Sequence, residues 1–169
     1  MDYLKREIFY PFRGNADEEA IRKTISAYNE YIASIKDKLP KKLLKTYLDE
    51  DEFNDYIIRE LLILGNARSY SKNSDEIIIK LCLEKTEIDL YFNDLSFLKL
   101  EMENNKSCWT IIHNERQSDK SLIGIEEIVL CELGIVKDNL YKFEFVTSSG
   151  ANVVIQFSKI KILKKVRGF

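Results

Sequence analysis

The spacing of hydrophobic residues changes near residue 70, from a helical repeat to strand alternation. Before this point apolar side chains recur every three or four residues, and after it they recur every two. A repeat of 3.6 residues is typical of an amphipathic helix, and a repeat of two is typical of a half-buried strand. The chain is therefore predicted to be an α+β protein with N-terminal helices and a β-rich C-terminal part. The helical positions are Ile21, Ile25, Tyr28, Ile32 and Ile35, and the alternating ones include Ile77, Ile79, Leu81, Leu83, Ile88, Leu90, Phe92, Val153, Ile155 and Phe157.

The N-terminal pattern predicts three helices within a helical layer over residues 15–65. Asn15 is a suitable N-cap for the first helix, and Pro40 suits the first position of the second. Gly65-Asn66 is a natural end for the third. The predicted helices span Ala16–Lys38, a short stretch after Pro40 with Leu43, Leu44, Tyr47 and Leu48 facing inward, and Asp49 or Glu50 through Leu64.

The C-terminal pattern predicts an antiparallel sheet over residues 76–163. Short polar turns between regularly spaced strands favour hairpins over β-α-β units. The polar segment 68–75 separates the two parts, so we expect a single domain over 1–169 with a helical half at 1–66 and a β half at 76–163. The predicted strands are Glu76–Glu84, Thr86–Phe92, Phe97–Met102, Cys108–Glu115, Ser121–Leu133, Leu140–Thr147 and Asn152–Leu163.

Two of these strands carry a break in their alternation, which predicts a curved sheet. Phe157 and Ile160 fall on opposite parities, so a bulge or strong bend is expected near Ser158-Lys159. A second bulge is expected at Glu126-Glu127. Paired bends favour a curved antiparallel meander or half-barrel, with the helices packed on it and a cleft at the junction as the default ligand site.

Charge and composition narrow the class of protein. Lys and Arg number 26 and Asp and Glu 28, giving a net charge of -2, which argues against a nucleic-acid partner. The N-terminus has no apolar signal core and the longest apolar run, Ile57–Leu64, is too short to cross a bilayer, so a cytoplasmic protein without membrane contact is expected. Abundant Ile, Lys and Asn suggest a bacterial source. The cysteines Cys82, Cys108 and Cys131 form no C-x-x-C pair and are expected to be reduced thiols beside the core.

The candidates for chemistry are one histidine and a few carboxylates. His113 is the only histidine, and Glu126, Glu127 and Glu132 lie in an otherwise apolar strand, where an inward carboxylate needs a partner and often marks a site. Alternatively, a bulge turns both members of the adjacent pair outward. No G-x-S-x-G, P-loop or dinucleotide fingerprint is present, so no catalytic residue is assigned and the chain is interpreted as leaning away from an enzyme.

No metal or cofactor is predicted. One histidine and three scattered cysteines do not give zinc spacing. The acidic stretch from Asp49 to Glu60 has the length of a calcium loop, but Asn54 stands where the loop requires glycine and Phe53 occupies a ligand position. We therefore interpret the stretch as the cap and acidic first turn of the third helix. The C-terminal lysines Lys159, Lys161, Lys164 and Lys165, with Arg167, are interpreted as the solvated face of an edge strand ahead of Phe169.

Three segments resemble an uncharacterised bacterial family of unknown function, whose members have an aromatic N-terminal lead-in, two or three helices and a β-rich C-terminal half. The resemblance covers most of the chain and implies no activity. In that family a histidine often precedes the aspartate matching Asp55, whereas Asn54 stands there in this chain. The segments are Tyr3-Leu4-Lys5-Arg6-Glu7 with Tyr10, Asn54-Asp55-Tyr56-Ile57-Ile58, and Phe143-Glu144-Phe145 with Val154-Ile155-Gln156-Phe157.

The sequence best fits a non-enzymatic protein-interaction module, of the immunity-like or accessory kind. The reasons are the lack of a catalytic constellation and the nine Tyr and nine Phe residues, since aromatic side chains are enriched at interfaces. The expected partner is another protein. Two alternatives stay open: a small-ligand-binding protein that uses the concave side of the sheet, and a hydrolase that uses Glu126 or Glu127 with His113.

Overall fold

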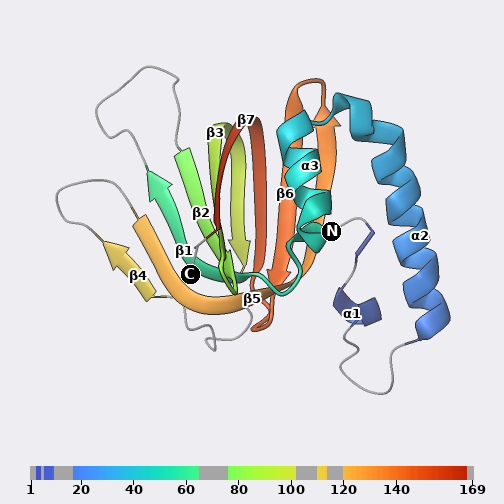
Figure 1. Ribbon diagram of the computed structural model, residues 1–169, viewed down its shortest axis with the longest axis horizontal. Coiled ribbons are helices and arrows are strands. Elements are labelled where there is room, and N and C mark those ends of the chain that lie inside the picture. The colour runs from blue at the N-terminus through green and yellow to red at the C-terminus, as the bar shows by residue number, and fades with distance from the viewer. Residues whose placement is uncertain are drawn as a thin grey trace.

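Helices and a strongly curved antiparallel sheet pack together in the computed structural model (Figure 1). The structure describes residues 3–4, 6–9, 17–64, 76–101, 110–113 and 120–166. The α+β class and the antiparallel sheet are confirmed. The elements are α1 (Arg6–Phe9), α2 (Glu18–Ile35), η1 (Lys36–Lys38), α3 (Lys41–Asp49), η2 (Asp51–Phe53), β1 (Ile57–Leu64), β2 (Glu76–Leu83), β3 (Thr86–Glu101), β4 (Thr110–His113), β5 (Lys120–Lys137), β6 (Leu140–Thr147) and β7 (Asn152–Val166).

The sheet consists of two meanders joined along both of their outer strands. The strand order is β1-β2-β3-β7-β6-β5-β4, and β1 also pairs with β5. The strands β1–β2–β3 and β5–β6–β7 are thus each a meander, and the pairings β3–β7 and β1–β5 close six strands into a ring. β4 lies outside this ring, on the first residues of β5. Closure leaves few open edges, which is how curved β proteins limit unwanted strand pairing.

The first two helices form largely where the pattern predicts them. Asp17, rather than the expected Asn15, caps α2 by accepting hydrogen bonds from the amides of Glu19 and Ala20. Lys41–Asp49 confirms the second helix after Pro40. Leu43 and Tyr47 of that helix are buried as predicted, but Leu48, which was expected to face inward, is 55% exposed.

The third predicted helix is wrong, because residues 57–64 form strand β1. The sheet therefore begins inside residues 1–66, the stretch expected to be helical. β1 is hydrogen-bonded on both sides, to β2 and to β5. A strand held on both edges gains backbone hydrogen bonds and buried area from distant segments, which local helix propensity does not match.

The acidic stretch before β1 is not a helix start either. Asp51, Glu52 and Phe53 have φ of 46°, 59° and 59°, so this turn is left-handed. Such a conformation costs roughly 1–2 kcal/mol per residue for residues with a side chain. Phe53 is fully buried against Tyr47 and Phe143, and this burial offsets the strain of the turn.

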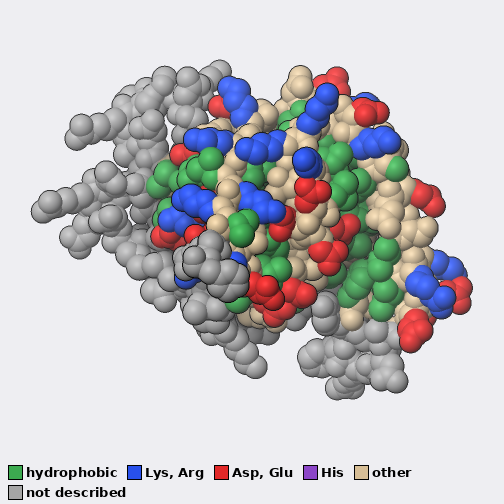
Figure 2. Space-filling view, in the orientation of Figure 1, with side chains coloured by type: hydrophobic (Ala, Val, Ile, Leu, Met, Phe, Trp, Pro, Cys, Tyr) green, Lys and Arg blue, Asp and Glu red, His purple; other side chains and the backbone are tan. Residues whose placement is uncertain are grey.

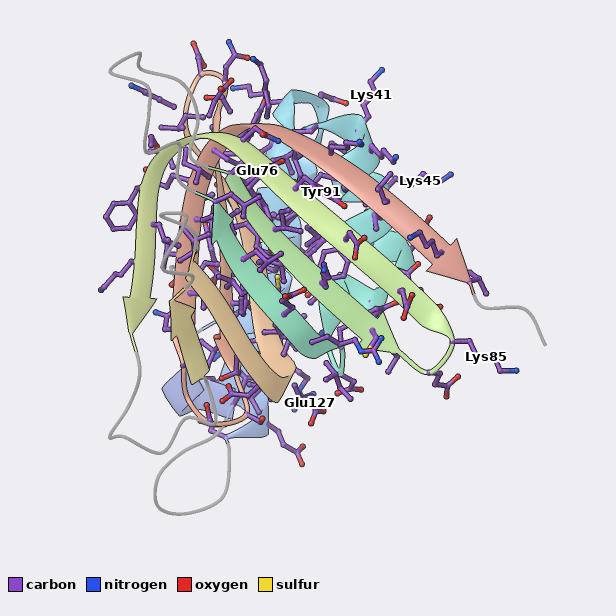
Figure 3. All side chains as sticks on the ribbon, turned by 90° about the vertical axis from the view of Figure 1, so that its left-hand side faces the viewer. Lys41, Lys45, Glu76, Lys85, Tyr91 and Glu127 are labelled. Atoms are coloured by element: carbon purple, nitrogen blue, oxygen red, sulfur yellow. The ribbon has the colours of Figure 1, made fainter. Side chains whose placement is uncertain are left out.

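The bend predicted at Ser158-Lys159 is present and is shared with the neighbouring strand. Phe157 and Ile162 are both buried although they have opposite parity, so β7 turns over between them. β3 turns over beside it at Asp94, where φ is 53° and the carboxylate lies 2.8 Å from the Lys159 ammonium. Figure 3 shows both strands curving together. The turn predicted at Asn93-Asp94 is thus a bend inside one long strand.

Tyrosine hydroxyls bond the backbone of β5 beyond its pairing with β1. That pairing ends at Glu127, and Ile128 still exchanges backbone hydrogen bonds with Asp55 and Tyr56. Farther along, β5 turns backbone groups toward α2 and α3 rather than toward a strand. The Ile135 amide donates to the Tyr31 hydroxyl at 3.1 Å. Because a buried backbone group without a partner is costly, the helices take over the role of a neighbouring strand here.

A chain of hydroxyls closes the rest of this edge. The Leu133 amide donates to the Tyr28 hydroxyl at 2.7 Å, and the Tyr47 hydroxyl donates to the Cys131 carbonyl at 2.6 Å. The two hydroxyls are 2.9 Å apart, and since the Tyr47 proton is already donated, Tyr28 is the donor between them. Burial, the largest cause in each case, raises the pKa of both phenols well above the ordinary value, so the chain stays protonated.

Replacement of Tyr47 by phenylalanine is expected to lower the free energy of unfolding by about 2 kcal/mol, because it leaves the Cys131 carbonyl and the Tyr28 proton buried without partners. Urea unfolding measures this loss. Tyr91→Phe is the matched control, since Tyr91 lies on the outer face beneath the Lys161 ammonium, and its loss should stay within about 0.5 kcal/mol. Equal losses in the two variants would show that the hydroxyl chain does not stabilise β5.

Candidate functional site

The carboxylates singled out in the sequence divide between interior and surface. Glu126 is 2% exposed, and its carboxylate accepts a hydrogen bond from the Ser149 hydroxyl at 2.7 Å. Glu127 is exposed, as its label at the rim of Figure 3 shows. The expected bulge does not fall on this pair, because the pairing of β5 slips before it, against β1, and after it, at Val129 against β6. Glu126 therefore faces inward and Glu127 outward.

The strand register separates Glu126 from His113. His113 pairs with Lys120, six residues before Glu126 along β5. At about 3.3 Å per residue this is roughly 20 Å of strand. General acid–base chemistry needs groups within hydrogen-bond reach of one substrate atom, so this spacing weighs against a hydrolase built from the two residues. The side chain of His113 lies outside the described residues.

Glu132 belongs to a buried ionic cluster that holds the N-terminal segment. Glu132 and Glu144 face each other across β5 and β6, at 1% and 3% exposure. The Lys142 ammonium lies 3.2 Å from the Glu144 carboxylate and 4.0 Å from that of Glu132. The Glu132 carboxylate also accepts hydrogen bonds from the backbone amides of Tyr3, at 2.8 Å, and Leu4. Since its oxygens bind the chain itself, we assign this cluster to structure rather than to substrate.

Aromatic side chains fill the concave side of the sheet, where a small ligand was expected. Phe143 is fully buried, and its ring centroid lies 6.0 Å from that of Phe53 and 5.3 Å from that of Phe92. Phe157 in turn lies 4.9 Å from Phe92. This packing weighs against a ligand site in that place. Trp109 lies outside the described residues.

The abundance of aromatic residues therefore has a structural explanation. Tyr28, Tyr47 and Tyr56 are buried, and Tyr31 stacks on Tyr3 with 4.9 Å between ring centroids. Phe97 is the one aromatic residue among the exposed large hydrophobics of the described chain, at 44%. Most aromatic residues of the described chain thus belong to the core and do not form an interaction surface. A candidate surface therefore has to be identified from the exposed side chains.

Exposed apolar side chains and lysines lie on two adjoining elements, α3 and the second half of β7. Leu48, on α3, is 55% exposed and Val166, at the end of β7, is 67% exposed. In Figure 3 Lys41 projects from the start of α3 and Lys45 from farther along it, on the side of the helix where the second half of β7 runs. In Figure 2 lysine and arginine side chains follow the upper part of the molecule across these elements. We define the α3–β7 corner by Lys41, Lys45 and Leu48 of α3 and Lys164, Lys165 and Val166 of β7.

Polar contacts connect the two elements of the corner. Past Phe157, β7 pairs with β3 alone among the described strands, which leaves one of its edges facing α3. The Lys42 ammonium donates to the Ile162 carbonyl on this edge at 2.7 Å. Farther along, Lys164 forms an ion pair with Glu50, which directly follows α3. The predicted edge strand with solvated lysines is thus confirmed for the second half of β7.

Glu50 connects the end of α3 to the end of β7. Its carboxylate accepts hydrogen bonds from both Lys164 and the Tyr56 hydroxyl. Burial alone would raise the pKa of the Glu50 carboxyl. The hydrogen bonds from Lys164 and Tyr56 and the charge of Lys164 outweigh burial, so the pKa lies below its ordinary value and the pair stays charged at neutral pH.

The exposed side chain of Phe97 is less suited to docking. Phe97 lies on the part of β3 that, past Phe92, pairs with β7 alone among the described strands. This part of β3 carries a register break against β7, between Leu95 and Phe97, and the exposed Lys99. Bulges and edge lysines are devices that keep an open strand from pairing with another chain. At the α3–β7 corner, by contrast, α3 covers the free edge of β7, so the corner offers exposed side chains rather than an open strand and is the candidate functional surface.

Comparison with known proteins adds no family. No protein-family model and no curated protein matches the chain. The resemblance to a family of unknown function therefore stays a prediction. Within the part of the chain that the structure describes, no cluster of His, Cys, Asp or Glu is arranged to hold a metal ion, and no helix is long and apolar enough to span a membrane.

Proposed function

We propose that this protein is a non-enzymatic, cytoplasmic protein-interaction module, of the immunity-like or accessory kind, that docks its partner on the α3–β7 corner. The observation that carries the proposal is the exposure of Leu48 and Val166 on adjoining, well-braced elements. Apolar side chains that stay open to water on a rigid surface gain free energy when a partner covers them, and such centres contribute most to binding.

The rigidity of the corner supports the same proposal. Lys42, Glu50 and Lys164 fasten α3 to β7, so the surface is preformed and little ordering is needed when a partner binds. Preorganisation of this kind lowers the entropic cost of association. The filled concave side and the separation of Glu126 from His113 leave the two alternatives with less support.

The double variant Leu48→Asp with Val166→Asp is expected to lose the partner. Affinity capture of the tagged full chain from its host should recover one stoichiometric protein with the wild type and not with the double variant, and titration of the purified pair should show at least about a tenfold loss of affinity. The physical reason is that the substitutions remove the apolar contact and introduce two charges that lose their water when the partner binds.

Ile25→Asp is the matched control for this experiment. Ile25 is 40% exposed, but it lies ten residues before the end of α2, about 15 Å from that end along the helix. This variant should capture the partner as the wild type does. Equal capture by the double variant would overturn the choice of surface, and a wild type that captures nothing would overturn the interaction function itself.

A further inference from the structure

We infer that the α3–β7 corner recognises an acidic, partly apolar segment of another protein. This inference rests on the proposed function and names the chemistry of the partner at the same surface. It combines three observations, which are the charge of the corner, the placement of that charge against helix preferences, and the apolar residues within it.

The corner carries positive charge that no described residue neutralises by an ion pair. Lys41, Lys45 and Lys165 are exposed, and none of them forms an ion pair with another residue that the structure describes. Lys164 is paired with Glu50, and Glu87, the register partner of Lys165, is paired with Arg59. These three ammonium groups, which have no ion pair among the described residues, favour an anionic partner because charge complementarity guides and orients docking.

These lysines stand where they do not help their helix. The first turn of α3 contains Lys41 and Lys42 and no acidic residue, although the N-terminal end of a helix favours negative charge. α2 follows the usual preference, with Asp17 as its cap and Glu18 and Glu19 in its first turn. Lys42 has a structural role on β7, but Lys41 and Lys45 repel each other at a spacing of four residues. Residues that go against the preferences of their helix, and that stabilise no other part of the structure, indicate a functional role.

The other groups at the corner favour a protein segment over a nucleic acid. Leu48 and Val166 offer apolar contact, and no aromatic residue of the described chain is exposed beside them for bases to stack on. A nucleic acid carries a charge at every phosphate, so part of it would face Asp49 at the end of α3, whereas a short peptide can place a few carboxylates on the lysines alone. A peptide with alternating carboxylates and apolar side chains satisfies both kinds of group at once.

Peptides of defined charge test this inference on the full-length protein. Fluorescence anisotropy measures binding of three labelled peptides of about 12 residues, in which leucine alternates with glutamate, glutamine or lysine, and of a single-stranded oligonucleotide of similar length. The glutamate peptide is expected to bind at least about tenfold more tightly than the glutamine peptide at low salt. At about 1 M salt, where the Debye length is about 3 Å, this preference should largely vanish.

Charge reversal locates the preference on the surface. Lys41→Glu with Lys45→Glu should remove the preference for the glutamate peptide, while Lys23→Glu should keep it. Lys23 is exposed like the other two but lies twelve residues before the end of α2, about 18 Å from that end along the helix. Equal thermal unfolding of the variants excludes a change of fold, since all three lysines are exposed on helices.

Each outcome separates this inference from the proposed function. Equal binding of the glutamate and glutamine peptides, tighter binding of the oligonucleotide, or a preference that survives charge reversal would overturn the acidic partner. If the capture experiment succeeds while no peptide binds, the interaction function stands and the acidic segment is wrong. If Leu48→Asp with Val166→Asp leaves both capture and peptide binding unchanged, the corner itself is wrong.

Discussion

Replacement of Phe143 by alanine is expected to lower the free energy of unfolding by about 3–5 kcal/mol, the largest effect of any single change discussed for this protein. Phe143 is fully buried on β6, and its ring contacts those of Phe53, Phe92 and Phe145, with centroids 5.3–6.0 Å apart. Removing the ring leaves a cavity between the sheet and the left-handed turn. The paired strands around this cavity cannot easily move in to fill it. A domain of this size is only marginally stable, so much of its stability would be lost.

Two further variants make this prediction specific. Phe97→Ala removes the same ring from a 44% exposed position and should cost less than about 1 kcal/mol. Phe143→Leu retains much of the volume and should lose less than half as much as Phe143→Ala. Chemical unfolding followed by far-UV circular dichroism gives the free energy of unfolding of all three variants. A loss below about 1 kcal/mol for Phe143→Ala would mean that the aromatic cluster is not the centre of the core.

The helix predicted at residues 57–64 illustrates where sequence patterns fail. The run Ile57–Leu64 is almost continuously apolar, and a short run of this kind fits a buried helix or a buried strand equally well. Its two buried positions, Ile58 and Leu61, are three residues apart, which is a helical spacing. In the structure a register break between Ile58 and Glu60 produces this spacing within a strand. Pairing with β2 and β5 decides the conformation, and no local pattern contains that information.

The bend in β3 is the opposite case. The local turn signal in the sequence is correct, but the chain bends there instead of ending the strand. Asn93-Asp94 is a turn signal, and Asp94 does adopt a left-handed conformation. The chain does not reverse there, because residues on both sides of Asp94 pair with β7, which bends with it. The break of alternation in β7 was visible in the sequence, and the matching break in β3 was interpreted as the end of a strand.

The candidate surface was the least predictable feature. Leu48 lies four residues after the partly buried Leu44, so periodicity alone assigns it to the inward face, yet it is 55% exposed. Which side of a short helix is covered depends on the elements around it, here the edge of β7. One signal was available, namely the lysines in the first turn of α3, which oppose the helix dipole. The inward position of Glu126, by contrast, was one of the two orientations that its apolar neighbours indicated.

Replacement of Glu132 by alanine is expected to cost about 3 kcal/mol of unfolding free energy and to release the N-terminal segment. The Glu132 carboxylate binds the amides of Tyr3 and Leu4 and lies beside Lys142. Its removal leaves these buried donors without an acceptor, and backbone donors buried without partners cost about 1–3 kcal/mol each. Hydrogen exchange at Tyr3 and Leu4 should therefore rise more than exchange in the sheet.

A competing effect decides how large the loss is. Glu132 faces Glu144 across the strands, and like charges directly opposite each other destabilise a sheet. Alanine removes that repulsion, but Lys142 already screens the pair at 3.2 Å from Glu144, so the lost hydrogen bonds dominate. Glu132→Gln, which keeps one acceptor oxygen, should lose less than alanine, and Glu19→Ala, in an exposed pair, should lose at most about 0.5 kcal/mol. An alanine variant as stable as the wild type, with unchanged exchange at Leu4, would show that side-chain packing rather than this carboxylate holds the N-terminal segment against β5.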